Sequence, residues 1–213
     1  NYISQISVIF HRSLTDQSGI FDEQMKRYVD WDFFLRLSIH VCPIAIPVIL
    51  SHAYQNRADQ HVSKIHDRDQ YLALLREKFF NKQQAMNTFL DIDSIDPEIE
   101  SLLKSCYVST RIIHTLHNPP KVTIVIPSYE SIDFLKLCIS SIRKFTKNYH
   151  TIIVDNNSGT EVSTYLNSIS HDPDITIILN NINYGFTYAV NQGIESANPN
   201  SDIVILNNDT LVT

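Results

Sequence analysis

Four short apolar runs that alternate with helical patterns constrain the fold of this chain more than any other feature. The runs are KVTIVIP (121–127), TIIVD (151–155), ITIIL (175–179) and DIVIL (202–206). Nearly continuous apolar runs of this length are typical of strands buried on both faces. Amphipathic helices fit the segments between them, which are SIDFLKLCISSIRKF (131–145), TEVSTYLNSI (160–169) and YGFTYAVNQGIESA (184–197). The alternation predicts an α/β fold of βαβ units, with a mainly parallel, doubly wound sheet.

The first 120 residues follow a different pattern. QISVIFHRS (5–13) and IAIPVILSHAY (44–54) are typical of strands, and DWDFFLRLSIH (30–40) is typical of a short helix. Residues 62–120 are mostly of helical pattern and end at a proline pair. We therefore predict three parts: a smaller α/β piece over residues 1–61, a helical connector over 62–120, and the parallel α/β part over 121–213.

Composition and charge exclude several classes of function. The 213 residues include 17 basic and 23 acidic side chains, and the net charge of −6 gives no electrostatic basis for nucleic-acid binding. No apolar run approaches the roughly 18 residues that a membrane span needs. Cys42, Cys106 and Cys138 are spaced neither as a disulfide framework nor as a metal site. Their spacing favours a reducing compartment, so we expect a cytoplasmic location, at the inner face of the membrane in a longer parent protein.

Polar residues follow each of the four predicted strands. The exits are PSYE (127–130), DNNSGT (155–160), NNINYGF (180–186) and NND (207–209). Ligands bind outside the carboxyl ends of parallel strands, so four polar exits at one edge predict a ligand site. Turn chemistry is the alternative for any single exit. Three of only four glycines, Gly159, Gly185 and Gly193, lie in this part and indicate backbone positions that need conformational freedom.

Phosphate-binding loops of the G-x-G-x-x-G and G-x-x-x-x-G-K-[ST] types are absent from the sequence. The phosphates of a nucleotide would therefore need another countercharge. An acid at a strand end suggests a divalent cation that bridges to diphosphate oxygens.

Four segments in order, VTIVIPSYE, TIIVDNNS, NNINYGFTYAVNQG and IVILNND, resemble the N-terminal half of a family 2 glycosyltransferase with the GT-A fold. The resemblance covers residues 121–213 and implies a site for a nucleotide-diphosphate sugar, with Tyr129 and Asp155 at the base and ribose. It also implies Mn²⁺ or Mg²⁺ at Asp209. Asn208 and Asp209 match the last two positions of the family's metal-binding D-x-D-like motif. Because Asn207 and Asn208 are amides, only Asp209 is a carboxylate, and we expect lower metal affinity. The residues implied at the donor are Pro127, Tyr129, Glu130, Asp155, Asn157, Asn181, Gly185, Asn191 and Asn208.

The segment SVIFHRSLTDQSGIFDEQMKRYVDWDFFLRLS (7–38) resembles the C-terminal half of the same kind of domain. The family has a segment of the form E-D-x-D-x-x-x-R, in which Val29 here replaces the glutamate. The resemblance implies that Asp30 is the catalytic base, which takes the proton from an acceptor hydroxyl. From the residues alone, a helix cap is favoured over a catalytic role for Asp30, and Arg36 is typical of an ion pair with Asp32.

The two halves occur in the reverse of the family's order. A tandem excerpt, a circular permutant and a chance similarity of the first half are three explanations. We favour the excerpt, because Asn1 is not a methionine, and because the segment that the family has between the NND motif and the strand at residue 5 is missing here. A further hypothesis is that the two halves pair within this chain, since each contains what the other lacks.

The predicted function is transfer of a sugar from a nucleotide-diphosphate sugar to an acceptor hydroxyl of a glycan or lipid-linked acceptor. The resemblance implies an inverting, metal-assisted enzyme of polysaccharide or glycoconjugate synthesis, and a fragment that is inactive alone. The alternative is a non-catalytic module that binds a nucleotide sugar or serves as a scaffold. A nucleotidyltransferase fits less well, because PSYESID contains no glycine-rich basic loop.

Overall fold

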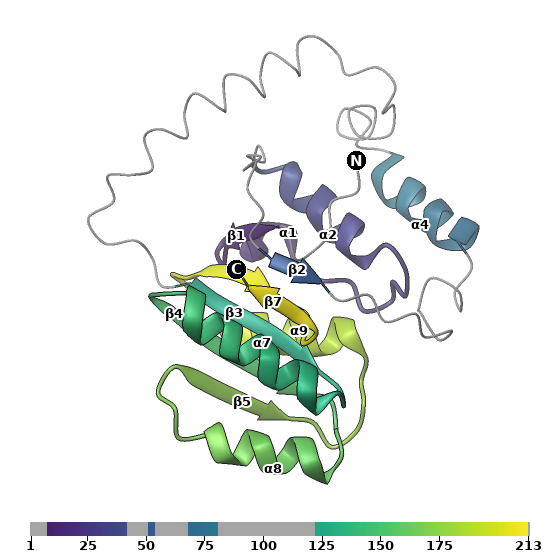
Figure 1. Ribbon diagram of the computed structural model, residues 1–213. Coiled ribbons are helices and arrows are strands. Elements are labelled where there is room, and N and C mark those ends of the chain that lie inside the picture. The colour runs from purple at the N-terminus through teal and green to yellow at the C-terminus, as the bar shows by residue number, and fades with distance from the viewer. Residues whose placement is uncertain (1–7, 42–50, 54–67, 81–121, 213) are drawn as a thin grey trace, which may run out of the picture.

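The structure, a computed structural model, describes residues 8–41, 51–53, 68–80 and 122–212. Its centre is a five-stranded sheet in the order β1-β6-β3-β4-β5 (Figure 1). Four of these strands are parallel, and β1 pairs antiparallel with β6 at one edge. The strands are β3 (Val122–Ser128), β4 (Tyr149–Asp155), β5 (Ile175–Leu179), β6 (Asp202–Ile205) and β1 (Ile9–His11).

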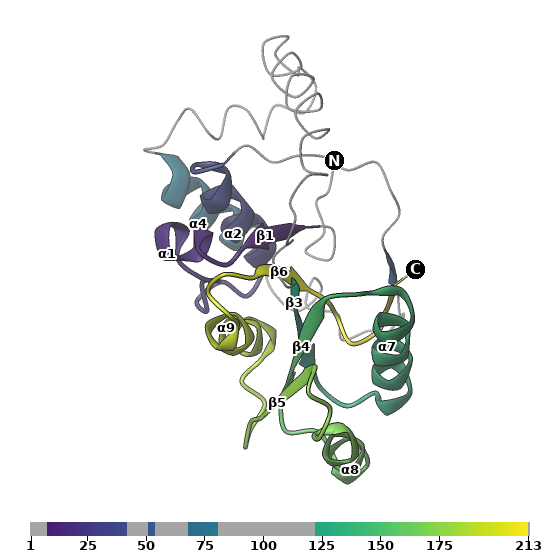
Figure 2. The same ribbon diagram turned by 90° about the vertical axis from the view of Figure 1, so that its left-hand side faces the viewer.

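Helices cover both faces of the sheet (Figure 2). On one face lie α7 (Ile132–Phe145) and α8 (Thr160–Ile169), and on the other lies α9 (Phe186–Ser196). Neighbouring residues of a strand point to opposite faces, so Val125 enters the core under α9 while Ile124 and Ile126 enter the core under α7 and α8. Because both faces of β3 and β4 are buried, these two strands are continuous apolar runs instead of alternating ones. The edge strand β5 is buried only in part, and Leu179 at its end is 58% exposed.

The predicted mixed α/β fold with a mainly parallel sheet is confirmed. The predicted run 175–179 coincides with β5, and the predicted helix 160–169 coincides with α8. Two short elements were not predicted from the sequence, α1 (Leu14–Ser18) and β7 (Thr210–Val212).

Residues 8–41 share the sheet and the core with residues 122–212. They contain β1, α1 and α2 (Val29–Ser38), and β1 extends the sheet beyond β6 with Phe10 opposite Ile203. Phe10, Phe21 and Phe33 belong to the same buried cluster as residues of β3, β4, β6 and α9. A second antiparallel pair joins β2 (Ser51–Ala53) to β7. The hypothesis that the two halves pair within this chain agrees with these contacts, whereas the division at residues 61 and 120 stays a prediction.

The described part of the predicted connector is one helix, α4 (Arg68–Phe80). Leu75 of this helix is buried against Met25, which lies just before α2. Of the predicted strand 44–54, only Ser51–Ala53 is described. Residues 62–67 and 81–120 of the connector, together with Cys42 and Cys106, lie outside the described residues. Within the described ranges, no helix combines the length and the hydropathy that crossing a membrane requires.

Candidate active site

The four polar exits lie at one edge of the sheet, because the strands that precede them are parallel neighbours. Ser128 at the end of β3 pairs with Asp155 at the end of β4, and Asp155 pairs with Leu179 at the end of β5. Val125 of β3 pairs with Ile205, the last residue of β6. Asp155 at the end of β4, and Tyr129, Asn180 and Asn207 in the loops after β3, β5 and β6, therefore lie at one shared edge.

The exit of β3 gives its three predicted residues different environments. Pro127 is buried inside the strand, opposite Val154, and can act there only through the backbone and packing. Tyr129 is half exposed at the edge, where a flat ligand can reach its ring. The Glu130 carboxylate accepts a hydrogen bond from the backbone N–H of Gly159 (3.0 Å), the residue before α8. Glu130 thus caps α8, an interaction that favours a structural role for it.

A cavity of about 230 Å³ lies beside Glu130, between the first turns of α7 and α8. Its lining includes the carboxylates of Glu130, Asp133 and Glu161, which would repel a diphosphate. The cavity is also below the usual volume of a ligand pocket, which is roughly 300 Å³ or more. We therefore place the candidate donor site along the open edge and not in this cavity.

Asp155 is a buried carboxylate, only 2% exposed, at the end of β4. Its Oδ1 accepts a hydrogen bond from the Ser158 hydroxyl (2.5 Å), and its Oδ2 accepts one from the Ser158 backbone N–H (3.1 Å). Asn157, with φ of 63°, completes this turn in the left-handed region, which asparagine tolerates well. The side chain of Asp155 is therefore held in place by its own turn.

A network of side-chain amides connects the exits of β4 and β5 to α9, and the sequence did not predict it. Asn180 Nδ2 donates hydrogen bonds to Asn156 Oδ1 (2.9 Å) and Gln192 Oε1 (2.8 Å). Asn156 Nδ2 donates in turn to the carbonyl oxygen of Gly185 (3.1 Å). These bonds stabilise the relative positions of the loops at the carboxyl ends of β3 to β6. We call this edge of the sheet the candidate donor edge.

The predicted residues of the third exit separate into surface and buried positions. Asn181 is exposed, and its Oδ1 accepts a hydrogen bond from the Tyr184 hydroxyl (3.1 Å). Gly185 precedes α9 with φ of 87°, so it is the one of the three predicted glycines that needs conformational freedom. For Gly159 and Gly193 that prediction was wrong: Gly159 has φ of −65°, and Gly193 lies within α9, pressed against β3.

Asn191 is buried in α9 and holds residues 21–23. Its Oδ1 accepts a hydrogen bond from the backbone N–H of Phe21 (3.0 Å), and its Nδ2 donates to the carbonyl oxygen of Phe21 (2.9 Å). Nδ2 also contacts the Glu23 carboxylate at 3.1 Å. The side chain that was predicted at the donor thus connects the two halves, and a donor-binding role for it stays a prediction.

Asn207, Asn208 and Asp209 form the turn between β6 and β7, closed by a hydrogen bond from Thr210 N–H to the Asn207 carbonyl oxygen (3.1 Å). The turn packs on α7, where Cys138 Sγ lies 3.7 Å from the same carbonyl oxygen. Burial raises the pKa of the Asp209 carboxyl above its usual value. Burial, together with the charge of Asp209, raises the pKa of the Cys138 thiol to about 12. Asp209 is therefore a partly desolvated carboxylate that gains from a nearby cation.

The donor set at this turn suits a divalent cation that is shared with a substrate. Asp209 supplies one carboxylate, and Asn208 supplies an amide oxygen nearby in the chain. Among the described residues, Thr210 Oγ1 is buried without a hydrogen-bond partner. Groups of three His, Cys, Asp or Glu side chains that could enclose a metal are not found in the described ranges. Magnesium commonly binds through one or two carboxylates plus substrate phosphates, and the turn fits that mode better than a cage made by protein alone.

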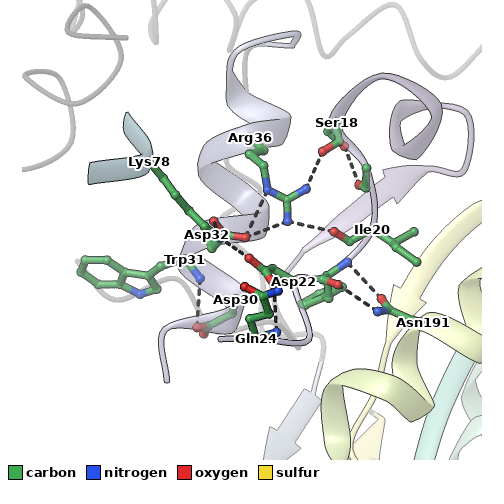
Figure 3. A network of polar contacts seen from close by, with 12 residues as sticks. Ser18, Ile20, Asp22, Gln24, Asp30, Trp31, Asp32, Arg36, Lys78 and Asn191 are labelled. Atoms are coloured by element: carbon green, nitrogen blue, oxygen red, sulfur yellow. Dashed lines mark hydrogen bonds and ion pairs between the residues drawn. The ribbon is translucent and has the colours of Figure 1, made fainter. Parts of the chain in front are cut away.

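Asp30 is the second residue of α2, which begins at Val29 after Tyr28. Its Oδ1 accepts a hydrogen bond from the Trp31 backbone N–H (3.0 Å), so it satisfies one donor of the first turn without being the N-cap residue. The ion pair between Asp32 and Arg36 that the spacing indicated is present, at 2.8 Å. Arg36 also donates to the carbonyl oxygens of Ser18 (2.5 Å) and Ile20 (2.9 Å). Figure 3 shows the loop that contains Ile20 and Asp22 between α2 and Asn191.

Known protein families and solved structures match part of this chain. Residues 123–213 match the family described as Glycosyl transferase family 2. No curated protein matches the chain. The match covers the segment that builds β3 to β7 and all four polar exits, so it coincides with the candidate donor edge.

Two solved structures, each with a bound nucleotide sugar, are similar to part of this chain. The mannosyltransferase PcManGT from Pyrobaculum calidifontis, in complex with GDP-Man and Mn²⁺, is 18% identical with a TM-score of 0.39, over 49% of this chain and 34% of that chain. TarS 1–349 from S. aureus, in complex with UDP-GlcNAc, is 15% identical with a TM-score of 0.38, over 42% of this chain and 26% of that chain. The chain thus covers well under half the length of either structure.

Proposed function

We propose that residues 122–212, together with the segment that contains α2, form the site of a glycosyltransferase that uses a nucleotide-diphosphate sugar. The observation that carries the proposal is the coincidence of the family match with one sheet edge that presents Tyr129, Asp155 and Asp209. In this proposal Tyr129 and Asp155 contact the nucleoside. The Asp209 turn faces the diphosphate.

The proposed reaction is an inverting transfer to an acceptor hydroxyl. Asp30 takes the proton of that hydroxyl as its oxygen attacks the anomeric carbon, and the bond from that carbon to the diphosphate oxygen breaks. A divalent cation held by Asp209 and Asn208 would neutralise charge on the departing diphosphate. The side-chain amides of Asn156 and Asn180 in the loops and of Gln192 in α9 keep the donor edge in place during the step. A glycan or a lipid-linked glycan, in the synthesis of a polysaccharide or glycoconjugate, is the acceptor that we propose.

A panel of UDP-, GDP- and dTDP-sugars with Mn²⁺, added to the full-length parent protein, tests the proposal, with release of free nucleoside diphosphate as the readout. We expect release with at least one donor, and a loss of about 100-fold or more in Asp209→Ala and Asp30→Asn. Asp16→Ala is the matched control, because Asp16 is 73% exposed on α1 and forms only a surface pair with Arg12. Binding of a donor without turnover would instead indicate a non-catalytic module. Equal activity in Asp209→Ala would contradict the assigned site.

A further inference from the structure

Lys78 at the end of α4 contacts two carboxylates that belong to the other segment. Its Nζ lies 2.9 Å from Asp32 Oδ1 and also forms an ion pair with Asp22 Oδ2. Figure 3 shows Lys78 approaching α2 from α4, above the loop that contains Asp22. One cation therefore joins three pieces of chain: the connector helix, the first turns of α2 and the loop before them.

Asp32 needs this cation because its side chain is completely buried. One carboxylate oxygen pairs with Arg36 at 2.8 Å, and the other pairs with Lys78. Breaking a buried pair by removing one partner is strongly destabilising, since an uncompensated charge is left behind. For Asp22, burial disfavours the charged form, but the hydrogen bonds from Lys78 and the Gln24 backbone N–H, together with the charges of Lys78 and Arg36, outweigh it and the pKa is lowered. Lys78 shows the reciprocal effect: its pKa is raised despite partial burial, through hydrogen bonds to the two acids.

The sequence of α4 specifies how Lys78 reaches this position. Tyr71, Leu72, Leu75 and Lys78 are spaced three and four residues apart and share one face of the helix. Leu75 is buried against Met25, and Tyr71 and Leu72 pack around the same cluster with Trp31. The apolar residues of this face pack α4 against the segment that contains Met25 and Trp31. Lys78, at the end of the same face, then reaches Asp22 and Asp32.

The loop that Lys78 holds also connects α2 to the candidate donor edge. Asp22 follows Phe21, whose backbone N–H donates a hydrogen bond to the Asn191 side chain of α9 and whose carbonyl oxygen accepts one from it. Arg36 holds the preceding residues through the carbonyl oxygens of Ser18 and Ile20. Asp30 lies two residues before Asp32 in the same helical turn. Displacement of this loop therefore shifts Asp30 relative to α9.

We propose that Lys78 is a positioning residue, which fixes the loop 18–24 against the first turn of α2 and thereby sets the place of Asp30 relative to the donor edge. This inference rests on the proposed function for its catalytic readout, but not for its structural one. In this proposal α4 helps to position the catalytic residue, in addition to connecting the two halves of the chain.

The test compares Lys78→Met, Lys78→Arg and the double variant Lys78→Met with Asp22→Asn in the full-length parent protein. Amide hydrogen exchange reports the loop, and hydrolysis of the UDP-, GDP- and dTDP-sugar panel with Mn²⁺ reports the site. In Lys78→Met we expect faster exchange over residues 18–24 and 30–32, and a kcat lower by about 10- to 100-fold with an unchanged donor KM. Lys78→Arg should restore both. Asp22→Asn should restore part of the loss, because it removes one of the two facing acids.

Lys136→Met is the matched control, because Lys136 is an exposed lysine on α7 whose ammonium lies over the Tyr165 ring. It should leave exchange over 18–24 unchanged. Unchanged exchange in Lys78→Met overturns the proposal, as does a kcat equal to that of the natural chain. If no donor is hydrolysed by the natural chain, the proposed function fails, while the exchange readout still decides whether Lys78 positions the loop.

Discussion

At the scale of single residues, Asp209 allows a prediction about stability and pH. Burial raises its folded-state pKa, so its contribution to stability is fully present below the unfolded pKa of about 3.9 and is lost as pH rises through the folded pKa. Asp209→Asn removes the ionisation, and we expect the variant to gain stability relative to the natural chain between about pH 4 and 7. Urea unfolding of both proteins across this range measures the difference.

A second measurement separates a cation site from simple desolvation. Added Mn²⁺ should stabilise the natural chain at neutral pH, by about 2.7 kcal/mol when free Mn²⁺ is about 100 times its Kd, and should leave Asp209→Asn unaffected. Asp16→Asn reports the effect of removing an exposed carboxylate from α1. Equal stabilisation by Mn²⁺ in Asp209→Asn would show that the cation binds elsewhere.

The single residues that the sequence predicted best are those whose position follows from a strand end. Asp155 and Asp209 were predicted at the carboxyl edge, and the parallel strands bring their loops there. The roles of Glu130 and Asn191 could not be predicted, because their partners Gly159 and Phe21 are 29 and 170 residues away in the chain. Long-range hydrogen bonds of this kind leave no periodic pattern in a sequence.

At the scale of elements, Gly193 determines how closely α9 approaches the sheet. A Cβ at this position would lie 2.3 Å from Val125 Cγ1 in β3, a distance that atoms in real structures do not adopt. Gly193→Ala should therefore push α9 from β3 and destabilise the fold by about 1–3 kcal/mol. Chemical denaturation measures the change. Gly159→Ala is the matched control, since its Cβ would meet the Glu130 carboxylate at an ordinary 3.6 Å; an equal loss there would refute the steric explanation.

Elements with their own periodicity were predicted, and short elements that depend on a distant partner were not. The apolar runs of β3 to β6 and the amphipathic helices α7, α8 and α9 contain enough residues to show a pattern. Strand β7 has three residues, and α1 has five. Strand β7 exists through its pairing with β2 and a hydrogen bond from Val212 N–H to the Ser141 hydroxyl in α7. Local sequence cannot specify such contacts.

At the scale of the whole molecule, residues 8–41 and 122–212 share one sheet and one buried core, although the two halves occur in the reverse of the family's order. Strand β1 extends the sheet past β6, and the Phe10, Phe21 and Phe33 rings fill the core beneath α9. Phe21 and Phe33 stack with ring centroids 4.2 Å apart, and Phe10 meets Phe33 edge-on at 5.1 Å. A core that draws its side chains from both segments predicts that they unfold as one cooperative unit.

Phe33→Ala tests that cooperativity, because Phe33 is completely buried and lies in α2, far in sequence from β6. We expect a loss of about 3–5 kcal/mol, and faster amide exchange at Ile203 and Ile205 of β6 as well as within α2. Val162→Ala is the comparison, because Val162 is buried in the other core, between α8 and the sheet. If Phe33→Ala loosens residues 8–41 while exchange in β6 stays at its natural rate, the two segments fold separately. Asp30 then has no fixed relation to Asp209, and the tandem excerpt explains the reversed order better than a shared site.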